Sequence, residues 1–141
     1  MINKIDKFHF YIGETIMFCQ RIEHDIKVSY ACMLDGNFNK NYEQIKNETL
    51  GQTVKMLEEL DNCDEDPYLS KNDYNLLRKI TKIRNHLVHK TYCEFIYSDE
   101  KYERDFNKEA QKLYNEHQRL KNLCEIIQKV RFDIAKKFDR L

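Results

Sequence analysis

The sequence predicts an all-α protein, an up-and-down bundle of about four helices whose first and last members are long, forming a single domain over residues 1–141. Three glycines and one proline are too few for the many turns of a β-sandwich. Apolar residues recur every three or four positions over long stretches, which is the spacing of amphipathic helices. Because 41% of the residues are apolar and are spaced in this way, the chain can build one core and is not expected to be disordered.

The first predicted helix covers residues 4–34. Its apolar positions are spaced by three or four throughout, and they are Ile5, Phe8, Ile12, Ile16, Cys19, Ile22, Ile26, Tyr30 and Met33. Gly13 costs about 1 kcal/mol relative to alanine, which a helix of this length tolerates. The run Asp35-Gly36-Asn37 predicts the end of the helix. A polar connection is expected from there to about Lys46.

A shorter helix is predicted over residues 50–60, starting near Asn47 or Thr49. Its apolar positions are Leu50, Val54, Leu57 and Leu60. The acidic run at residues 61–67 ends in proline, which disfavours a helix at the residue before it. The spacing of its carboxylates does not match a calcium-binding EF-hand loop. We therefore expect a solvated acidic loop.

The third predicted helix starts at Ser70, where Asp73 completes a capping arrangement, and runs to about Lys90. Its inner stripe consists of Leu76, Ile80, Ile83 and Leu87. Residues 91–97 are interpreted as a loop. The final helix follows from about residue 98 to the end of the chain, with Arg131 at a position where the pattern calls for an apolar residue. Its nearly heptad spacing suits an antiparallel bundle or a dimer interface.

Composition limits the classes of function. Lys and Arg number 24, and so do Asp and Glu, so the molecule as a whole has no electrostatic attraction to a polyanion. Any nucleic-acid site must be local. No apolar run approaches the roughly 20 residues that span a bilayer, and no secretion signal is recognisable, so a cytoplasmic location without membrane contact is expected. The five cysteines include no C-x-x-C pair, and neither a disulfide framework, a metal site nor a cofactor is expected.

Residues 78–90 are the local exception to this balance. They contain five Lys or Arg residues, two of the five histidines and no carboxylate. On a helical wheel at about 100° per residue, Arg84 falls inside the apolar arc. A desolvated guanidinium requires a partner, because a buried unpaired charge is costly. The partner is expected to be a carboxylate of another helix, a group in a subunit cleft or a bound anion, and the candidate carboxylates are Glu14, Glu23 and Asp25.

Asn85, His86 and His89 lie together on a different face of the same helix. This set of groups suits RNA cleavage without a metal. One imidazole can accept the proton of a ribose 2′-hydroxyl, and a second can protonate the departing 5′-oxygen. A guanidinium can stabilise the negative charge that develops on the phosphorane.

The segment Arg84-Asn85-His86-Leu87-Val88-His89 resembles the motif of the HEPN family, an Arg and a His separated by four to six residues, often with Asn after the Arg. The resemblance implies a helical bundle that forms a homodimer, with both motifs facing a common cleft. It also implies metal-independent endoribonuclease activity of the toxin-antitoxin or phage-defence type, with an antitoxin protein as a possible partner. Arg84 and His89 match the essential pair, and Asn85 matches the polar position.

These observations together predict Arg84, His89, Asn85 and His86 as catalytic residues. His86 is included for its proximity alone. Four neighbouring residues are predicted to bind RNA, three through charge and one by stacking on bases: Lys79, Lys82, Lys90 and Tyr92.

Two other interpretations remain open. In the first, the chain is a non-catalytic HEPN-like module for dimerisation and for binding a partner or a nucleotide, which its zero net charge favours. In the second, Arg84 pairs with a neighbouring helix and His89 stabilises a helix C-terminus, where a cation is favourable. Among the other histidines, His117 occupies an apolar register position and is expected to be hydrogen-bonded in a core or an interface.

Overall fold

A computed structural model describes residues 1–141 and confirms the all-α class. The chain forms five α-helices, α1 (Ile5–Met33), α2 (Phe38–Ile45), α3 (Leu50–Asp61), α4 (Lys71–His89) and α5 (Tyr102–Lys137), and two short 3-10 turns, η1 (Tyr92–Glu94) and η2 (Asp99–Lys101). The first and last helices are the longest, as predicted, with 29 and 36 residues. None of the helices combines the length and the apolar character needed to cross a bilayer.

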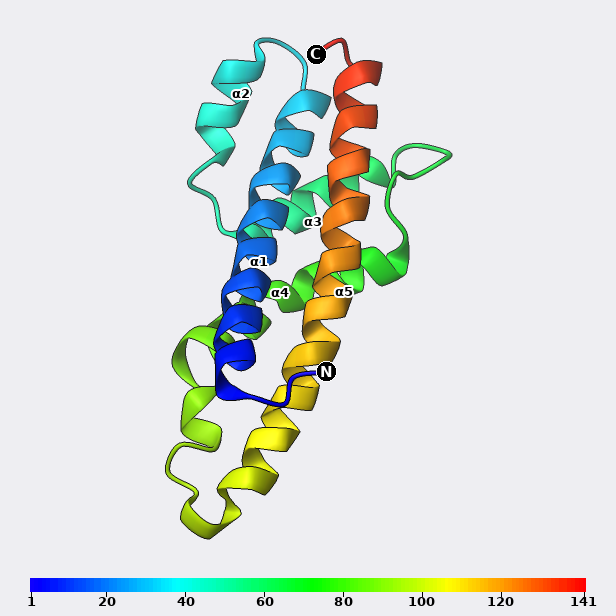
Figure 1. Cartoon of the computed structure of the whole chain (residues 1–141). Helices are drawn as coiled ribbons and strands as arrows, with labels where there is room; N and C mark the ends of the chain where they lie inside the picture. The colour runs from blue at the N-terminus through cyan, green and yellow to red at the C-terminus, as the bar shows by residue number, and fades with distance from the viewer.

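Helices α1 and α5 lie side by side and run in the same direction along the length of the molecule (Figure 1). Contacts between them advance together along both helices. Phe8 packs on Phe106 with ring centroids 5.4 Å apart, and the Glu14 carboxylate lies 2.9 Å from the His117 imidazole. Helices α3 and α4 cross behind this pair (Figure 1), so the up-and-down arrangement of about four helices is not confirmed. The crossing helices return the chain to the end where α1 begins, which makes α5 parallel to α1.

Helix α2 lies where we predicted a polar connection, and that prediction was wrong. Asn37 belongs to the run that predicted the end of α1, but in the structure it lies at the start of α2. Its side-chain oxygen accepts a hydrogen bond of 3.1 Å from the Lys40 amide and so caps α2. The helix has eight residues and buries only Ile45, so its hydrophobic pattern is too short to be recognised from spacing alone.

The acidic run after α3 is only partly solvated. Asp61, the last residue of α3, is 1% exposed. Its carboxylate accepts hydrogen bonds from the amides of Tyr68 (2.8 Å) and Leu69 (3.2 Å) and from the Tyr74 hydroxyl (2.7 Å). Burial and this bond to Asp61 raise the pKa of Tyr74. Asp61 therefore ties the connection between α3 and α4 to the core, and the expectation of a solvated carboxylate was wrong at this position.

The predicted start of α4 is confirmed in detail. The Ser70 hydroxyl accepts a hydrogen bond from the Asp73 amide, and the Asp73 carboxylate accepts one from the Ser70 amide, both at 3.1 Å. This capping box satisfies two amides that the helix itself leaves free.

The apolar core consists of two clusters joined along α1, α4 and α5. The larger contains Ile22, Ile80 and Leu120, and the smaller is built on Phe8, Phe95 and Phe106. The three rings of the smaller cluster pack with centroids 5.2 to 5.4 Å apart. Each such pair contributes about 0.5–1.5 kcal/mol beyond the area it buries.

On α1 and α5, the polar residues Glu14 and His117 lie between positions that belong to the two clusters. His117 is 5% exposed, and its Nε2 donates a hydrogen bond to the Glu14 carboxylate, in line with the buried, hydrogen-bonded position expected for it. Ile83 of α4 packs against both clusters. The end of α4 is therefore fixed at the junction between them.

The five cysteines divide into two classes of reactivity. Cys19, Cys32 and Cys124 are buried, and burial raises the pKa of all three thiols, that of Cys19 to about 12. Cys63 and Cys93 are exposed. Because the thiolate is the reactive form, we expect a thiol reagent near neutral pH to modify two cysteines rapidly in the folded protein and all five after unfolding in guanidinium. A third cysteine that reacted in the folded protein at the same rate as the first two would contradict this expectation.

Candidate functional site

The last two turns of α4 are rotationally fixed by their apolar side chains. Ile80 and Leu87 are 0% and 2% exposed, so they set which residues face outwards. Asn85 and His89 lie on the exposed side. The helix ends at His89, and the amides of Lys90 and Thr91 both donate to the His86 carbonyl at 2.9 Å. The polar part of the motif is thus presented at a helix C-terminus.

A hollow lies along this exposed side, and we call it the α4 hollow. Its volume is about 630 Å³ and no apolar residue lines it. The lining residues are Arg78, Thr81, Lys82, Asn85, His86, His89 and Lys90. The hollow therefore combines two imidazoles and an amide with three cationic side chains.

The structure brings together five of the eight residues predicted for the site. Lys82, Asn85, His86, His89 and Lys90 line the α4 hollow. The other three predicted residues do not line it, namely Lys79, Arg84 and Tyr92. The predicted set is thus divided, as the helical wheel had indicated for Arg84.

Arg78 lines the α4 hollow and was missed by the sequence analysis. A signal for it existed, because residues 78, 82, 85 and 89 follow one another at intervals of four, three and four along one helical face. Arg78 also bonds to Glu58 of α3 at 2.7 Å, with nearly half of its side chain exposed. The guanidinium is therefore oriented by α3 at the edge of the hollow.

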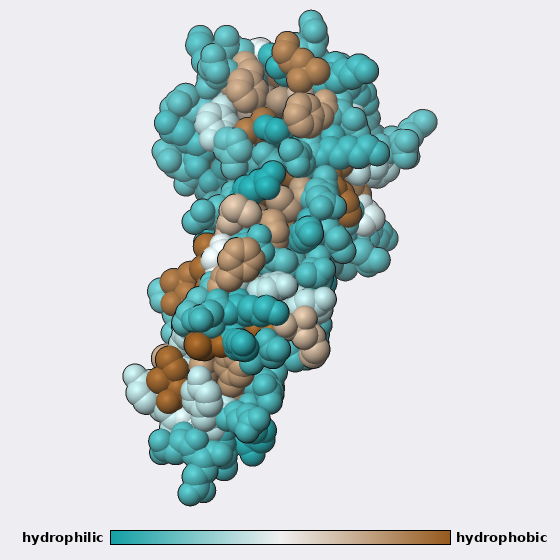
Figure 2. Space-filling model, viewed as in Figure 1, coloured by the Kyte–Doolittle hydropathy of each residue, from teal (hydrophilic) through white to brown (hydrophobic).

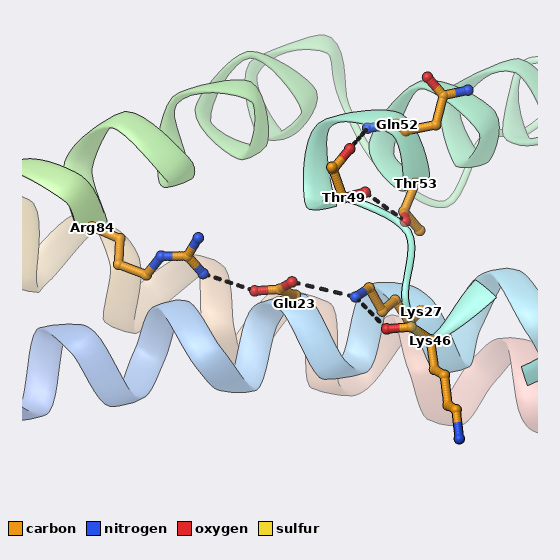
Figure 3. A network of polar contacts seen from close by, with 7 residues as sticks. All are labelled: Glu23, Lys27, Lys46, Thr49, Gln52, Thr53 and Arg84. Atoms are coloured by element: carbon orange, nitrogen blue, oxygen red, sulfur yellow. Dashed lines mark hydrogen bonds and ion pairs between the residues drawn. The ribbon is translucent and has the colours of Figure 1, made fainter. Parts of the chain in front are cut away.

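Arg84 points to the opposite side, towards α1. Its Nη1 donates to Glu23 Oε2 at 2.9 Å, and the side chain is 31% exposed. Of the partners that the sequence left open for Arg84, the structure shows a carboxylate of another helix, Glu23. The other Glu23 oxygen lies 3.3 Å from Nζ of Lys27, which also donates to the Lys46 carbonyl at 2.8 Å (Figure 3). One carboxylate thus holds two cations, and Nη1 is the only Arg84 nitrogen that bonds to it.

His86 is held from the side of α5. Its Nε2 lies 3.1 Å from Glu109 Oε2, and the Thr91 hydroxyl donates to the same oxygen at 3.0 Å. Glu109 is 8% exposed. Nearby on α5, burial raises the pKa of Glu116, while Lys112 and His86 act in the opposite direction. The bonds made by Glu109 fix both the imidazole of His86 and the backbone that follows His89.

No sequence signal pointed to a pairing of Glu109 with His86, because the two residues are 23 positions apart on different helices. Position 109 does lie three residues after Phe106 and four before Leu113, both of which are buried. A carboxylate at this spacing faces inwards and requires a partner. That spacing was the available clue.

Tyr92 packs against α1. Its ring contacts Phe8 edge-on, with centroids 5.5 Å apart, and its hydroxyl lies 2.6 Å from Nδ1 of His9. Burial raises the pKa of the phenol. The ring thus joins the segment after α4 to the smaller core cluster.

The basic residues between positions 78 and 90 are neutralised unequally. Arg78 and Arg84 pair with carboxylates of α3 and α1. Lys79, Lys82 and Lys90 are exposed and form no ion pair in the structure. Their charges therefore face solvent beside the histidines. No group of three or more His, Cys, Asp or Glu side chains is arranged to hold a metal ion.

No family model, curated protein or solved structure matches this chain.

Proposed function

We propose that this protein is a metal-independent endoribonuclease of the HEPN type, acting in a toxin-antitoxin or phage-defence role on cytoplasmic RNA. The observation that carries the proposal is the α4 hollow. Asn85, His86 and His89 line it together with unneutralised lysines, directly after Arg84 in the chain. Paired imidazoles beside cationic side chains are the groups that cleavage of a ribose phosphodiester requires.

The proposed reaction is a transfer of the phosphodiester to the neighbouring 2′-oxygen. His89, which is exposed, removes the 2′-hydroxyl proton, and the 2′-oxygen forms a new bond to phosphorus. The bond from phosphorus to the 5′-oxygen breaks, and His86 gives its proton to that oxygen. The products are a 2′,3′-cyclic phosphate and a 5′-hydroxyl. Asn85 positions the phosphate by hydrogen bonding.

The lysines have a separate part in the proposal. Lys82 and Lys90 lie in the α4 hollow and neutralise the RNA backbone, with Lys79 adding charge beside it. Lysine suits this task because its ammonium acts as a compact charge towards phosphate. In the proposal, Tyr92 contacts RNA with the part of its ring that does not pack on Phe8.

Arg84 enters the proposal as the group that stabilises negative charge in the transition state. Glu23 bonds to its Nη1, so other N–H groups of the guanidinium are left for a phosphate oxygen. Within one chain Arg84 and His89 lie on different faces of α4. We therefore propose a homodimer in which the α4 helices of two copies face each other across one cleft, so that each phosphate meets Arg84 of one copy and His89 of the other.

The proposal is tested by incubating the purified protein with end-labelled RNA in the presence of EDTA. We expect cleavage, and we expect the upstream product to carry a 2′,3′-cyclic phosphate. Absence of cleavage at high protein concentration would contradict the proposal. Sedimentation equilibrium on the same sample is expected to give the mass of two chains.

A second candidate function is a non-catalytic module that binds a partner or a nucleotide through the α4 hollow. The observation that favours it is the pairing of Arg84 with Glu23, which offsets the charge of the motif arginine. A protein that binds a nucleotide at Lys82 and Lys90 but leaves RNA intact would support this candidate over the nuclease.

A further inference from the structure

A second polar hollow lies between α1 and α5, away from the motif. Its volume is about 330 Å³, near the lower end of the roughly 300–1,000 Å³ range of ligand pockets. The residues that line it are Met17, Gln20, Arg21, His24 and Asp25 of α1, and Gln128 and Arg131 of α5. We call it the α1–α5 hollow. Figure 2 shows the face of the molecule on which α1 and α5 lie, where hydrophilic side chains predominate.

Arg131 is the residue that interrupts the apolar register of the last helix. In the structure its Nε lies 3.5 Å from Oδ1 of Asp25, which is long for a charge-assisted hydrogen bond. This Nε is buried and has no hydrogen-bond partner. Buried polar groups almost always have partners, because leaving one unsatisfied costs free energy. Arg131 thus forms no hydrogen bond within the protein, and its one ion pair is the long contact with Asp25.

Arg21 supplies a second guanidinium to the same hollow. It is exposed and lies one turn before Asp25 on α1. Arg21 forms no ion pair in the structure, whereas Arg131 pairs with Asp25. Two cations from different helices therefore converge with a single carboxylate, and the amides of Gln20 and Gln128 add hydrogen-bond donors. The balance of charge in the hollow favours an anion.

The α1–α5 hollow is distinct from the α4 hollow. Arg21 and Glu23 are two residues apart on α1, which places them about 160° apart around the helix axis. Glu23 faces α4 through Arg84, so Arg21 faces away from the motif. The two hollows share no lining residue. A ligand in one does not contact the residues of the other.

We propose that the α1–α5 hollow binds a phosphate group, held between the guanidinium groups of Arg21 and Arg131. Arginine is suited to this task because its planar donors match the oxygens of phosphate. Asp25 contacts Arg131 at Nε, which orients the guanidinium and leaves its terminal amino groups for the ligand. The phosphate is either free or the end of a phosphomonoester. The proposal does not rest on ribonuclease activity.

The test is a titration of the ¹⁵N-labelled protein, followed by NMR, with inorganic phosphate and separately with AMP at constant ionic strength. We expect saturable shifts in the millimolar range at the side-chain signals of Gln20, Gln128 and Arg131. Shifts with both ligands indicate recognition of the phosphate itself. Shifts with AMP alone indicate a phosphomonoester. If neither ligand shifts the signals of these residues, the proposal is overturned, even if signals of residues in the α4 hollow shift.

Arg21→Gln is the decisive variant, because Arg21 is exposed and its replacement leaves the pair of Asp25 and Arg131 in place. We expect its dissociation constant to rise about tenfold or more, the loss of one charge-assisted contact. Arg119→Gln, an exposed arginine of α5 outside the hollow, is the matched control and is expected to bind as the unchanged protein does. Equal binding of phosphate by the Arg21→Gln and Arg119→Gln proteins would show that the binding is non-specific and would overturn the proposal.

Discussion

Replacement of His89 by alanine is expected to lower RNA cleavage about 100-fold or more, since positioned acid and base groups contribute about 10²- to 10⁴-fold to such reactions. His89 is exposed at the last position of α4 and lies in the α4 hollow. Its side chain forms no hydrogen bond or ion pair within the protein, so the replacement removes no such contact. The fold is therefore expected to remain, and the measurement is the initial rate of cleavage of a labelled RNA in EDTA.

Val88→Ala is the matched control for this loss of activity. Val88 precedes His89 in the same turn, is 54% exposed and does not line the α4 hollow. We expect this protein to cleave RNA at the unchanged rate, and circular dichroism at 222 nm should be the same for both variants. Undiminished cleavage by an equally pure His89→Ala protein would remove His89 from the mechanism.

Replacement of Asp61 by alanine is expected to lower the free energy of unfolding by about 3 kcal/mol or more. The change removes the acceptor of three hydrogen bonds, and a bond to a charged group contributes about 1.5–3 kcal/mol. Two of the donors, the Leu69 amide and the Tyr74 hydroxyl, are in buried contacts and are left without a partner. Urea unfolding at pH 7, followed by circular dichroism, measures the difference.

Asp66→Ala serves as the comparison, because Asp66 belongs to the same acidic run but is exposed and forms no ion pair. Its replacement is expected to change stability by no more than about 0.5 kcal/mol. Equal stabilities for the Asp61→Ala and Asp66→Ala proteins would show that the buried carboxylate does not stabilise the connection between α3 and α4.

The parts of the fold that could be predicted are those in which one sequence pattern has one physical cause. The apolar spacing of α1 located it to within one residue at each end, because a long helix repeats its inner face many times. The Ser70 and Asp73 pair located the start of α4, because a capping box depends only on neighbouring residues. The short α2 offered too few repeats.

The arrangement of the helices depends on contacts that the sequence does not contain as patterns. The spacing of α5 indicated a buried face but not its direction relative to α1. The burial of Asp61 depends on Tyr74, which is 13 residues away on the next helix. Tertiary packing determines both the direction of α5 and the burial of Asp61, so only the structure shows them.

The candidate site was predictable to the extent that it lies on one helix. Lys82, Asn85, His86 and His89 share a face of α4, because their spacing of three, one and three residues keeps them on one side of any α-helix. The helical wheel also indicated that Arg84 needs a partner, but it could not decide between an anion, a subunit cleft and three carboxylates of α1, of which the structure shows Glu23. The contact of Glu109 with His86 was not predicted, because Glu109 lies on another helix.

The bonds around Glu23 have a consequence for the motion of Arg84. Glu23 holds Arg84 and Lys27 at the same time, and Lys27 is bonded to the backbone carbonyl of Lys46, just after α2 (Figure 3). Helix α2 buries only Ile45, so it is expected to open locally more often than the long helices. Each opening breaks the hydrogen bond from Lys27 to the Lys46 carbonyl. Lys27 then competes with Arg84 for the Glu23 carboxylate. In the proposed reaction, the freedom of Arg84 to turn towards an RNA phosphate would therefore depend on the stability of α2, the shortest α-helix of the fold.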